Sequence, residues 1–263
     1  MNVITTAALA LVALRGRQDP PAILHLMLAM LAIQASIGAV NDLVDRDPDR
    51  ASGRAKPLVQ GVLSVSTARV IAIACLAAAI VLSAGFGAVA WLLAIAGLGC
   101  GLVYDFWLKR TPASGLPYAV ALPLLPIWVW VALGQFQPVL LALVPLAGCI
   151  GLALHLANGL TDFDSDVLVG SGGLVQRLGK RSALFLCWGS FGLALVLVVA
   201  SAMAIPYQES LLAAGLCAAT LALASAIVLY LCRPVQRSLQ IGWAILVSAT
   251  AILALTWIAS LPR

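Results

Sequence analysis

Long apolar runs dominate this chain, and each is long enough to cross a lipid bilayer as a helix. A spanning helix needs about 20 apolar residues, and eight runs approach or exceed this length. They cover Pro21–Asn41, Thr67–Gly85, Ala88–Tyr104, Gly115–Leu133, Pro138–Thr161, Ser182–Ala204, Glu209–Leu231 and Leu239–Leu261. A shorter run, Met1–Leu14, is interpreted as a short first spanning helix. The sequence therefore predicts an all-α membrane protein with about nine transmembrane helices, forming a single integral-membrane domain over residues 1–263.

The composition excludes a soluble globular domain. Only 10% of the 263 residues are charged and 63% are hydrophobic, whereas soluble domains carry roughly 25% charged residues. The six cysteines lie in or beside apolar runs and form no CxxC pair, so neither a disulfide framework nor a zinc site is expected.

The basic residues lie mostly on one side of this topology. With nine spans, the loops 41–66, 104–114, 162–181 and 232–238 share one face and hold 11 of the 15 lysines and arginines. Cytoplasmic loops of membrane proteins carry such an excess, so we predict that this face is cytoplasmic. The net charge of +5 is explained by the loop topology, and no nucleic-acid partner is expected.

The acidic residues gather on the same face, which the rule for positive charges does not explain. Two segments carry the pattern Asn-x3-Asp-x3-Asp, and each ends a long apolar run. The first copy consists of Asn41, Asp45 and Asp49, and the second consists of Asn158, Asp162 and Asp166. Four membrane crossings separate the two runs, so both copies are expected to emerge on the cytoplasmic face.

The spacing predicts a stripe of oxygen ligands in each copy, because residues four apart share one face of a helix. Asp42 lies beside the first stripe, whereas Asp164 points away from the second. Pro48 disfavours helical conformation at the preceding residue, so Asp49 is expected on a bent or restarted helix.

Stacked carboxylates near lipid repel each other unless a cation neutralises them. Ligand sets made only of oxygen suit Mg²⁺, which often shares its shell with a substrate phosphate. Two such stripes would hold Mg²⁺ ions and clamp a diphosphate between them. The predicted metal ligands are Asn41, Asp42, Asp45, Asp49, Asn158, Asp162 and Asp166.

Basic side chains near the acidic motifs predict the rest of an anion site, because Arg and Lys bind phosphate oxygens. For any single residue, a plain topology signal is an equally good interpretation. The candidates that follow a motif or lie in the loop between the motifs are Arg54, Lys56, Lys109, Arg110 and Arg177. Arg233 and Arg237 are disfavoured because they lie far from both motifs.

Three residues are candidate catalytic groups. Asp45 and Asp162 are central in their motifs, and His155 lies one turn deeper than Asn158 on the second stripe. His155 would polarise a substrate, although a packed, hydrogen-bonded histidine is the more common outcome at such a position.

Taken together, the motifs resemble those of the UbiA superfamily of intramembrane prenyltransferases, in motif order and helix count. The resemblance rests on N-D-x2-D-x3-D at 41–49 followed by Lys56-Pro57-Leu58-x2-Gly61, on Asp162-x3-Asp166 followed by Gly170 and Gly179, and on Tyr104 with Lys109 and Arg110. It implies helices around a central cavity with a cytoplasmic cap, and it implies that Tyr104 belongs to the diphosphate site. It also implies Mg²⁺-dependent ionisation of a prenyl diphosphate and attack by an unidentified aromatic or lipid-like acceptor. The expected protein is a multi-pass cell-membrane enzyme whose active site faces the cytoplasm.

Three alternative functions follow from the same residues. A UbiA-type terpene cyclase would ionise the same diphosphate without an external acceptor, and no sequence feature separates it from a transferase. A CDP-alcohol phosphotransferase needs Asp-Gly followed by Ala-Arg, which Asp45-Arg46-Asp47-Pro48 does not supply. A transporter would place ionisable groups near the bilayer midplane, whereas the middle of the spans carries only His25 and His155 besides cysteines.

Overall fold

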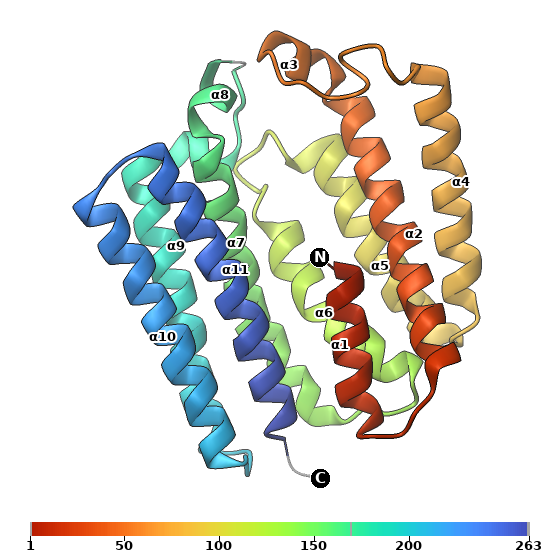
Figure 1. Ribbon diagram of the computed structural model, residues 1–263, viewed down its shortest axis with the longest axis vertical. Helices are drawn as coiled ribbons and strands as arrows, with labels where there is room; N and C mark the ends of the chain where they lie inside the picture. The colour runs from red at the N-terminus through yellow and green to blue at the C-terminus, as the bar shows by residue number, and fades with distance from the viewer. Residues whose placement is uncertain (1, 169, 262–263) are drawn as a thin grey trace. The chain divides into compact units, whose positions relative to one another are not determined.

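The computed structural model describes residues 2–168 and 170–261, and all of its regular elements in these ranges are helical (Figure 1). Within the described residues, seven helices are long and apolar enough to cross a membrane. They are α2 (Pro20–Val44), α4 (Val65–Ala84), α5 (Ala88–Val103) continued by η1 (Tyr104–Leu108), η2 (Pro138–Ala142) continued by α7 (Leu143–Thr161), α9 (Leu174–Ser201), α10 (Glu209–Cys232) and α11 (Gln236–Ala259).

Two further apolar helices, α1 (Asn2–Leu14) and α6 (Leu116–Ala132), are shorter than a full span. The all-helical fold class is thus confirmed with seven candidate spans, and nine spans stay a prediction. The two remaining helices, α3 (Arg46–Ala51) and α8 (Phe163–Leu168), are short and follow the two acidic helix ends.

Side-chain caps explain where two of the spanning helices begin. Asp19 accepts a hydrogen bond from the backbone N–H of Ala22 at 3.1 Å, and prolines occupy the first two positions of α2, where no backbone donor is needed. Ser64 caps α4 in the same way by accepting from the N–H of Thr67 at 3.0 Å. The polar residues that flank the apolar runs therefore set the start of these helices.

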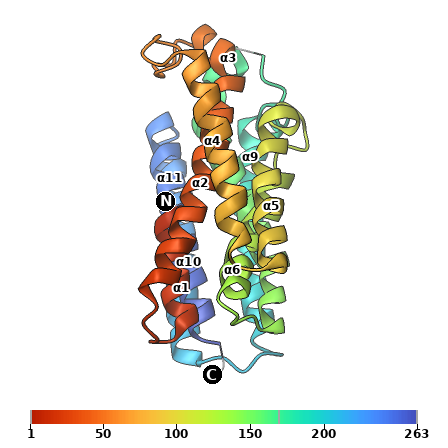
Figure 2. The same ribbon diagram turned by 90° about the vertical axis from the view of Figure 1, so that its right-hand side faces the viewer.

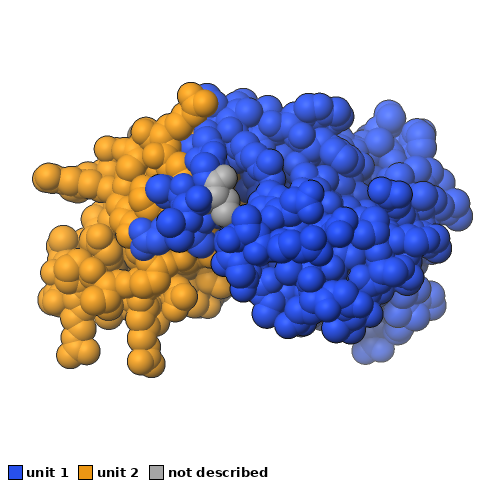
Figure 3. Space-filling view, turned by 90° about the horizontal axis from the view of Figure 1, so that it is seen from above, with its two compact units in different colours: residues 1–117, 124–136, 164–173 blue, residues 118–123, 137–163, 174–263 orange. Residues whose placement is uncertain are grey.

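The described chain divides into two compact units, which Figure 3 distinguishes by colour. Unit 1 comprises residues 1–117, 124–136 and 164–173, and unit 2 comprises residues 118–123, 137–163 and 174–263. The single domain expected from the sequence stays a prediction.

In unit 1, helix α2 packs against α1, α4 and α5, and Figure 2 shows α2, α4 and α5 running beside one another. The buried residues of α2 include Leu26 and Ile33, whereas those of α4 and α5 include alanines such as Ala72 and Ala94. Small residues let helix backbones approach closely, which is a common basis of helix association in membranes.

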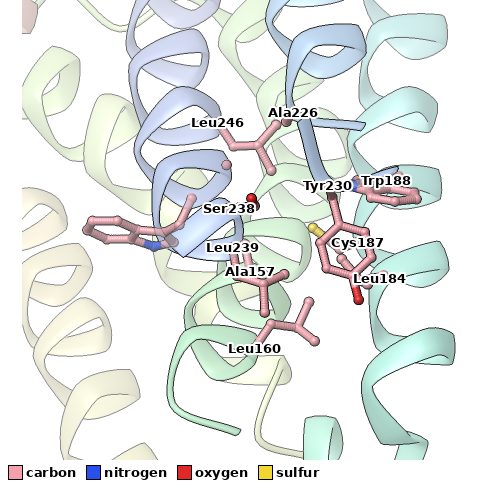
Figure 4. A pocket seen from close by; sticks show the side chains of 12 residues that line it. Ala157, Leu160, Leu184, Cys187, Trp188, Ala226, Tyr230, Ser238, Leu239 and Leu246 are labelled. Atoms are coloured by element: carbon pink, nitrogen blue, oxygen red, sulfur yellow. The ribbon is translucent and has the colours of Figure 1, made fainter. Parts of the chain in front are cut away.

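In unit 2, helix α7 packs against α9 and α11, and α10 packs against α11. About half of α7 is buried, and the Cys187 thiol on α9 donates a hydrogen bond to the backbone carbonyl of Ala153 at 3.2 Å. A small cavity lies among these four helices and is lined by Leu160, Cys187 and Tyr230, among others (Figure 4). Its volume of about 20 Å³ holds one water molecule and is far too small for a prenyl chain.

A glycine on α7 tests the close packing in unit 2. A Cβ atom at Gly151 would collide with the backbone carbonyl of Tyr118, and a backbone cannot move aside as a flexible side chain can. We expect Gly151→Ala to lower the free energy of unfolding by about 1–3 kcal/mol, seen as a lower melting temperature in detergent.

Gly192 provides the matched control on α9, because nothing lies within 4 Å of a Cβ atom placed there. Gly192→Ala should leave the melting temperature unchanged or raise it slightly. Equal melting temperatures for the two variants would contradict this packing.

Candidate functional site

The first acidic motif lies where α2 breaks. The helix ends at Val44, Asp45 is its C-cap with φ −87° and ψ −1°, and α3 restarts at Arg46. The backbone bonds still follow the four-residue spacing, because Asp45 N–H donates to Asn41 O at 2.9 Å and Asp49 N–H donates to Asp45 O at 2.7 Å. The predicted restart is confirmed, and it places Pro48 in the first turn of α3, where its missing N–H is not needed.

Lys56 neutralises two carboxylates of this motif. Its ammonium nitrogen lies 2.8 Å from Asp42 Oδ1 and 2.8 Å from Asp49 Oδ2, and Asp49 is only 3% exposed. Burial disfavours the charged form of Lys56, but its hydrogen bonds to Asp42 and Asp49 and their negative charges together outweigh that effect and raise its pKa above the ordinary value for lysine. A raised pKa means that this stabilisation is complete at neutral pH and is lost only as the pH rises through the raised value.

The loop between the two motifs supplies the basic side chains that pair with Asp45. Asp45 is 5% exposed, and its carboxylate forms an ion pair with Lys109 and lies 3.7 Å from the guanidinium of Arg110. The ammonium of Lys109 also lies 5.9 Å from the centre of the Tyr104 ring, within the range of a cation–π interaction. The grouping of Tyr104, Lys109 and Arg110 expected from the sequence is thus present beside the first motif.

Arg54 connects the two acidic motifs within unit 1. Its guanidinium lies 3.6 Å from Asp49 of the first motif and 3.4 Å from Asp166 of the second, and it donates to Ser165 Oγ at 3.1 Å. Two segments more than 100 residues apart in the chain therefore share one cation. Ser165 is a contact that sequence reasoning missed, because no pattern distinguishes it from other serines.

The second motif repeats the break of the first. Helix α7 ends at Thr161, Asp162 follows with φ −105° and ψ 5°, and α8 begins at Phe163. Gln236 of α11 donates a hydrogen bond to the carbonyl of Thr161 and so holds the end of α7 within unit 2. Asp164 is exposed whereas Asp162 and Asp166 are half-buried, in agreement with the predicted orientation.

Two other candidates lie in unit 2. Arg177 is exposed on α9, and Asn158 is half-buried on the last turn of α7. The α9 helix contains a kink at Gly179, whose φ of +75° lies in a region that favours glycine. This backbone conformation explains why position 179 is a glycine.

His155 is packed inside unit 2. It is 5% exposed, and its ring centre lies 4.9 Å from that of Tyr118. This packing explains why a histidine is buried here, and a catalytic role for His155 stays a prediction.

Asp105 is the acidic residue of this site that sequence reasoning did not select. It is 4% exposed, and its Oδ1 accepts a hydrogen bond from the amide of Asn41 at 2.8 Å. Its Oδ2 is buried and has no hydrogen-bond partner among the described residues. The signal available in the sequence was its position directly after Tyr104, on the same loop as Lys109.

The donor chemistry of the site fits a hard divalent cation such as Mg²⁺, since all candidate ligands offer oxygen. Within residues 2–168 and 170–261, no three Asp, Glu, His or Cys side chains converge closely enough to hold a metal ion. Lys56 and Lys109 are in contact with the carboxylates of Asp42, Asp45 and Asp49 and supply the positive charge. Binding of Mg²⁺ by the ligands named from the sequence stays a prediction. The Oδ2 atom of Asp105, which has no hydrogen-bond partner among the described residues, is a further candidate donor.

Comparison with known families gives a match over most of the chain. The model of the UbiA prenyltransferase family matches residues 2–241. A digeranylgeranylglyceryl phosphate synthase of Natronomonas pharaonis is 25% identical over 177 residues, which is 66% of this chain and 63% of that protein. The matched region thus spans less than two thirds of that relative. A protoheme IX farnesyltransferase of Clavibacter michiganensis is 27% identical over 227 residues, which is 81% of this chain and 73% of that protein.

Solved structures share the fold. A UbiA homologue from Aeropyrum pernix K1 superposes with a TM-score of 0.76 at 19% identity, covering 96% of each chain. A UbiA homologue from Archaeoglobus fulgidus, described as bound to GPP and Mg²⁺, superposes with a TM-score of 0.64 at 18% identity, also covering 96% of each chain.

The charge balance of the first motif can be tested without any substrate. Lys56→Met removes the cation of two carboxylates, one of them buried, and should lower the free energy of unfolding by about 1–3 kcal/mol. Melting temperatures in detergent with a chelator present measure this effect. Arg50→Met removes an exposed charge from α3 and should change the melting temperature little. Similar losses for both variants would show that Lys56 acts only through net charge.

Proposed function

Because the chain belongs to the UbiA prenyltransferase family, we propose that it transfers an isoprenyl group from a prenyl diphosphate to an aromatic or lipid-like acceptor within the membrane. The observation that carries this proposal is the joining of the two acidic motifs by Arg54, which binds Asp49 and Asp166. Two acidic segments that share one cation suit a diphosphate and its metal ions better than they suit a transported solute.

The cofactor in this proposal is Mg²⁺. When bound, Mg²⁺ draws negative charge from a leaving diphosphate. The residues that would hold it are Asn41, Asp42, Asp45, Asp49, Asn158, Asp162 and Asp166. The Archaeoglobus homologue with GPP and Mg²⁺ supports this pairing of donor and metal.

The lysines of the site have two roles in the proposed cycle. Without substrate, Lys56 and Lys109 neutralise buried carboxylates. With a metal ion bound, the carboxylates of Asp42, Asp45 and Asp49 would hold it, and the ammonium groups of Lys56 and Lys109 would be free to bind phosphate oxygens. Arg54 and Arg110 lie beside the same carboxylates and would complete the anion site, together with Tyr104 and Arg177.

In the proposed reaction, the bond between the allylic carbon and the diphosphate oxygen breaks, and the diphosphate leaves with the electron pair. The acceptor then forms a bond to that carbon and loses a proton. The prenyl chain would lie among the apolar helices, where each buried CH₂ contributes roughly 0.8 kcal/mol.

The proposed setting is a cell membrane crossed by nine helices, with α1 and α6 counted as short spans around a central cavity. The excess of basic residues in the loops that carry the motifs supports a cytoplasmic active site and a cytoplasmic cap.

The central acids of the two motifs provide the test. Asp45→Asn and Asp162→Asn should each lower turnover more than 100-fold, because each removes a metal-binding charge of the kind that stabilises a leaving group. The measurement is diphosphate release from a panel of prenyl diphosphates in the presence of Mg²⁺. Asp164→Asn is the matched control, since Asp164 is exposed, and it should have a much smaller effect.

Near-normal turnover in both Asp45→Asn and Asp162→Asn would overturn the two-motif site. Repeating the assay with and without an aromatic acceptor separates transfer from cyclisation, because only a cyclase converts the whole prenyl group without one.

A further inference from the structure

The carboxylate of Asp105 has no task in the function proposed above, although it lies beside the first acidic motif. Asp105 is carried by η1, the five-residue π-helical turn Tyr104–Leu108 that continues α5. The turn is closed by the N–H of Lys109, which donates to the carbonyl of Tyr104 at 2.8 Å. Such wide turns recur at functional sites, because the extra residue redirects the side chains around it.

The two oxygens of Asp105 have different surroundings. Oδ1 accepts the 2.8 Å hydrogen bond from the Asn41 amide nitrogen. Oδ2 is buried without a hydrogen-bond donor in the part of the chain that the structure describes, and the whole residue is 4% exposed. A buried charged oxygen without a partner is unfavourable, and such groups mark places where a water molecule or an ion binds or where a side chain takes part in catalysis.

The nearby lysines do not donate a hydrogen bond to Oδ2 of Asp105. Asp105 lies within electrostatic range of Lys109, Lys56 and Asp45, close to the first acidic motif. The ammonium of Lys109 is in contact with Asp45, however, and that of Lys56 is in contact with Asp42 and Asp49. Oδ2 of Asp105 therefore remains without a hydrogen-bond donor among the described residues after these ion pairs have formed.

The Asn41 hydrogen bond also sets the direction of a second oxygen. Because the amide nitrogen of Asn41 is held by Asp105, the carbonyl oxygen of the same amide is directed away from that bond. A carboxylate oxygen and an amide oxygen are both ligands that hard divalent cations accept.

We propose that Asp105 is a metal ligand of this site: its Oδ2 binds a divalent cation of the Mg²⁺ class, while its Oδ1 positions the Asn41 amide. This inference deepens the proposed function and rests on it. It adds to the two acidic motifs a ligand from the loop between them.

Asp105→Asn separates the two roles. The asparagine keeps an oxygen that can accept the Asn41 hydrogen bond, but an amide nitrogen replaces Oδ2 and cannot bind a metal. Binding of Mn²⁺ to the purified full-length protein, followed by electron paramagnetic resonance without any prenyl diphosphate, should weaken at least tenfold. Asp47→Asn removes one negative charge from the same acidic segment at an exposed position, and its Mn²⁺ affinity should stay within about twofold of the unsubstituted protein.

Unchanged Mn²⁺ affinity in Asp105→Asn would overturn the inference, and so would equal weakening in Asp105→Asn and Asp47→Asn. If Asp105→Asn fails to fold, crystals of the unsubstituted protein grown with Mn²⁺ test whether Asp105 binds the metal. Anomalous scattering from these crystals should place a metal in direct contact with Asp105 Oδ2, at roughly the 2.0–2.1 Å typical of Mg²⁺–oxygen bonds. A metal bound only by other residues would refute the assignment.

These outcomes are distinguishable from failure of the proposed function. If the unsubstituted protein binds no Mn²⁺ and releases no diphosphate, the prenyltransferase proposal falls, and the role of Asp105 falls with it. If the unsubstituted protein binds Mn²⁺ and releases diphosphate while Asp105→Asn retains its full Mn²⁺ affinity, only the role of Asp105 is lost.

Discussion

The organisation of the site depends on the need to neutralise carboxylates buried at the ends of apolar helices. An isolated buried carboxylate is strongly unfavourable, so such groups are found paired. Asp49 and Asp45 are 3% and 5% exposed, and each is paired with basic side chains from a different loop. This requirement brings together the end of α2, the segment after α3 and the turn after α5. The same carboxylates are the groups that a divalent cation would bind.

Both acidic motifs use the same local structure. At Asp45 and at Asp162 a long apolar helix stops, and a six-residue helix follows directly in the chain. The break keeps the acids within one or two turns of the apolar helix but outside its apolar stretch. In the proposed function, neighbouring parts of the same helices would bind an apolar prenyl chain and its charged diphosphate.

Lysine and arginine have different positions in this network. The ammonium groups of Lys56 and Lys109 are in direct contact with carboxylates, whereas the planar guanidinium of Arg54 forms ion pairs with one carboxylate of each acidic motif. Arginine is suited to bridging because its several donors diverge from one rigid fork. Lysine suits a cation that is exchanged, because its flexible stem lets the ammonium move from a carboxylate to a phosphate oxygen.

The sequence alone determined the helical class, the approximate extent of the spanning helices and the two acidic motifs, because apolar runs and four-residue spacings are local signals. It also identified Lys56, Lys109 and Arg110 as candidates near those motifs. Only the tertiary structure decided which cation pairs with which acid, that Arg54 connects Asp49 with Asp166, and that Asp105 belongs to the site. Most of those facts depend on how a π-helical turn directs one side chain and on contacts between segments more than 60 residues apart, such as Lys109 with Asp45 and Arg54 with Asp166. Neither leaves a periodic pattern in the sequence.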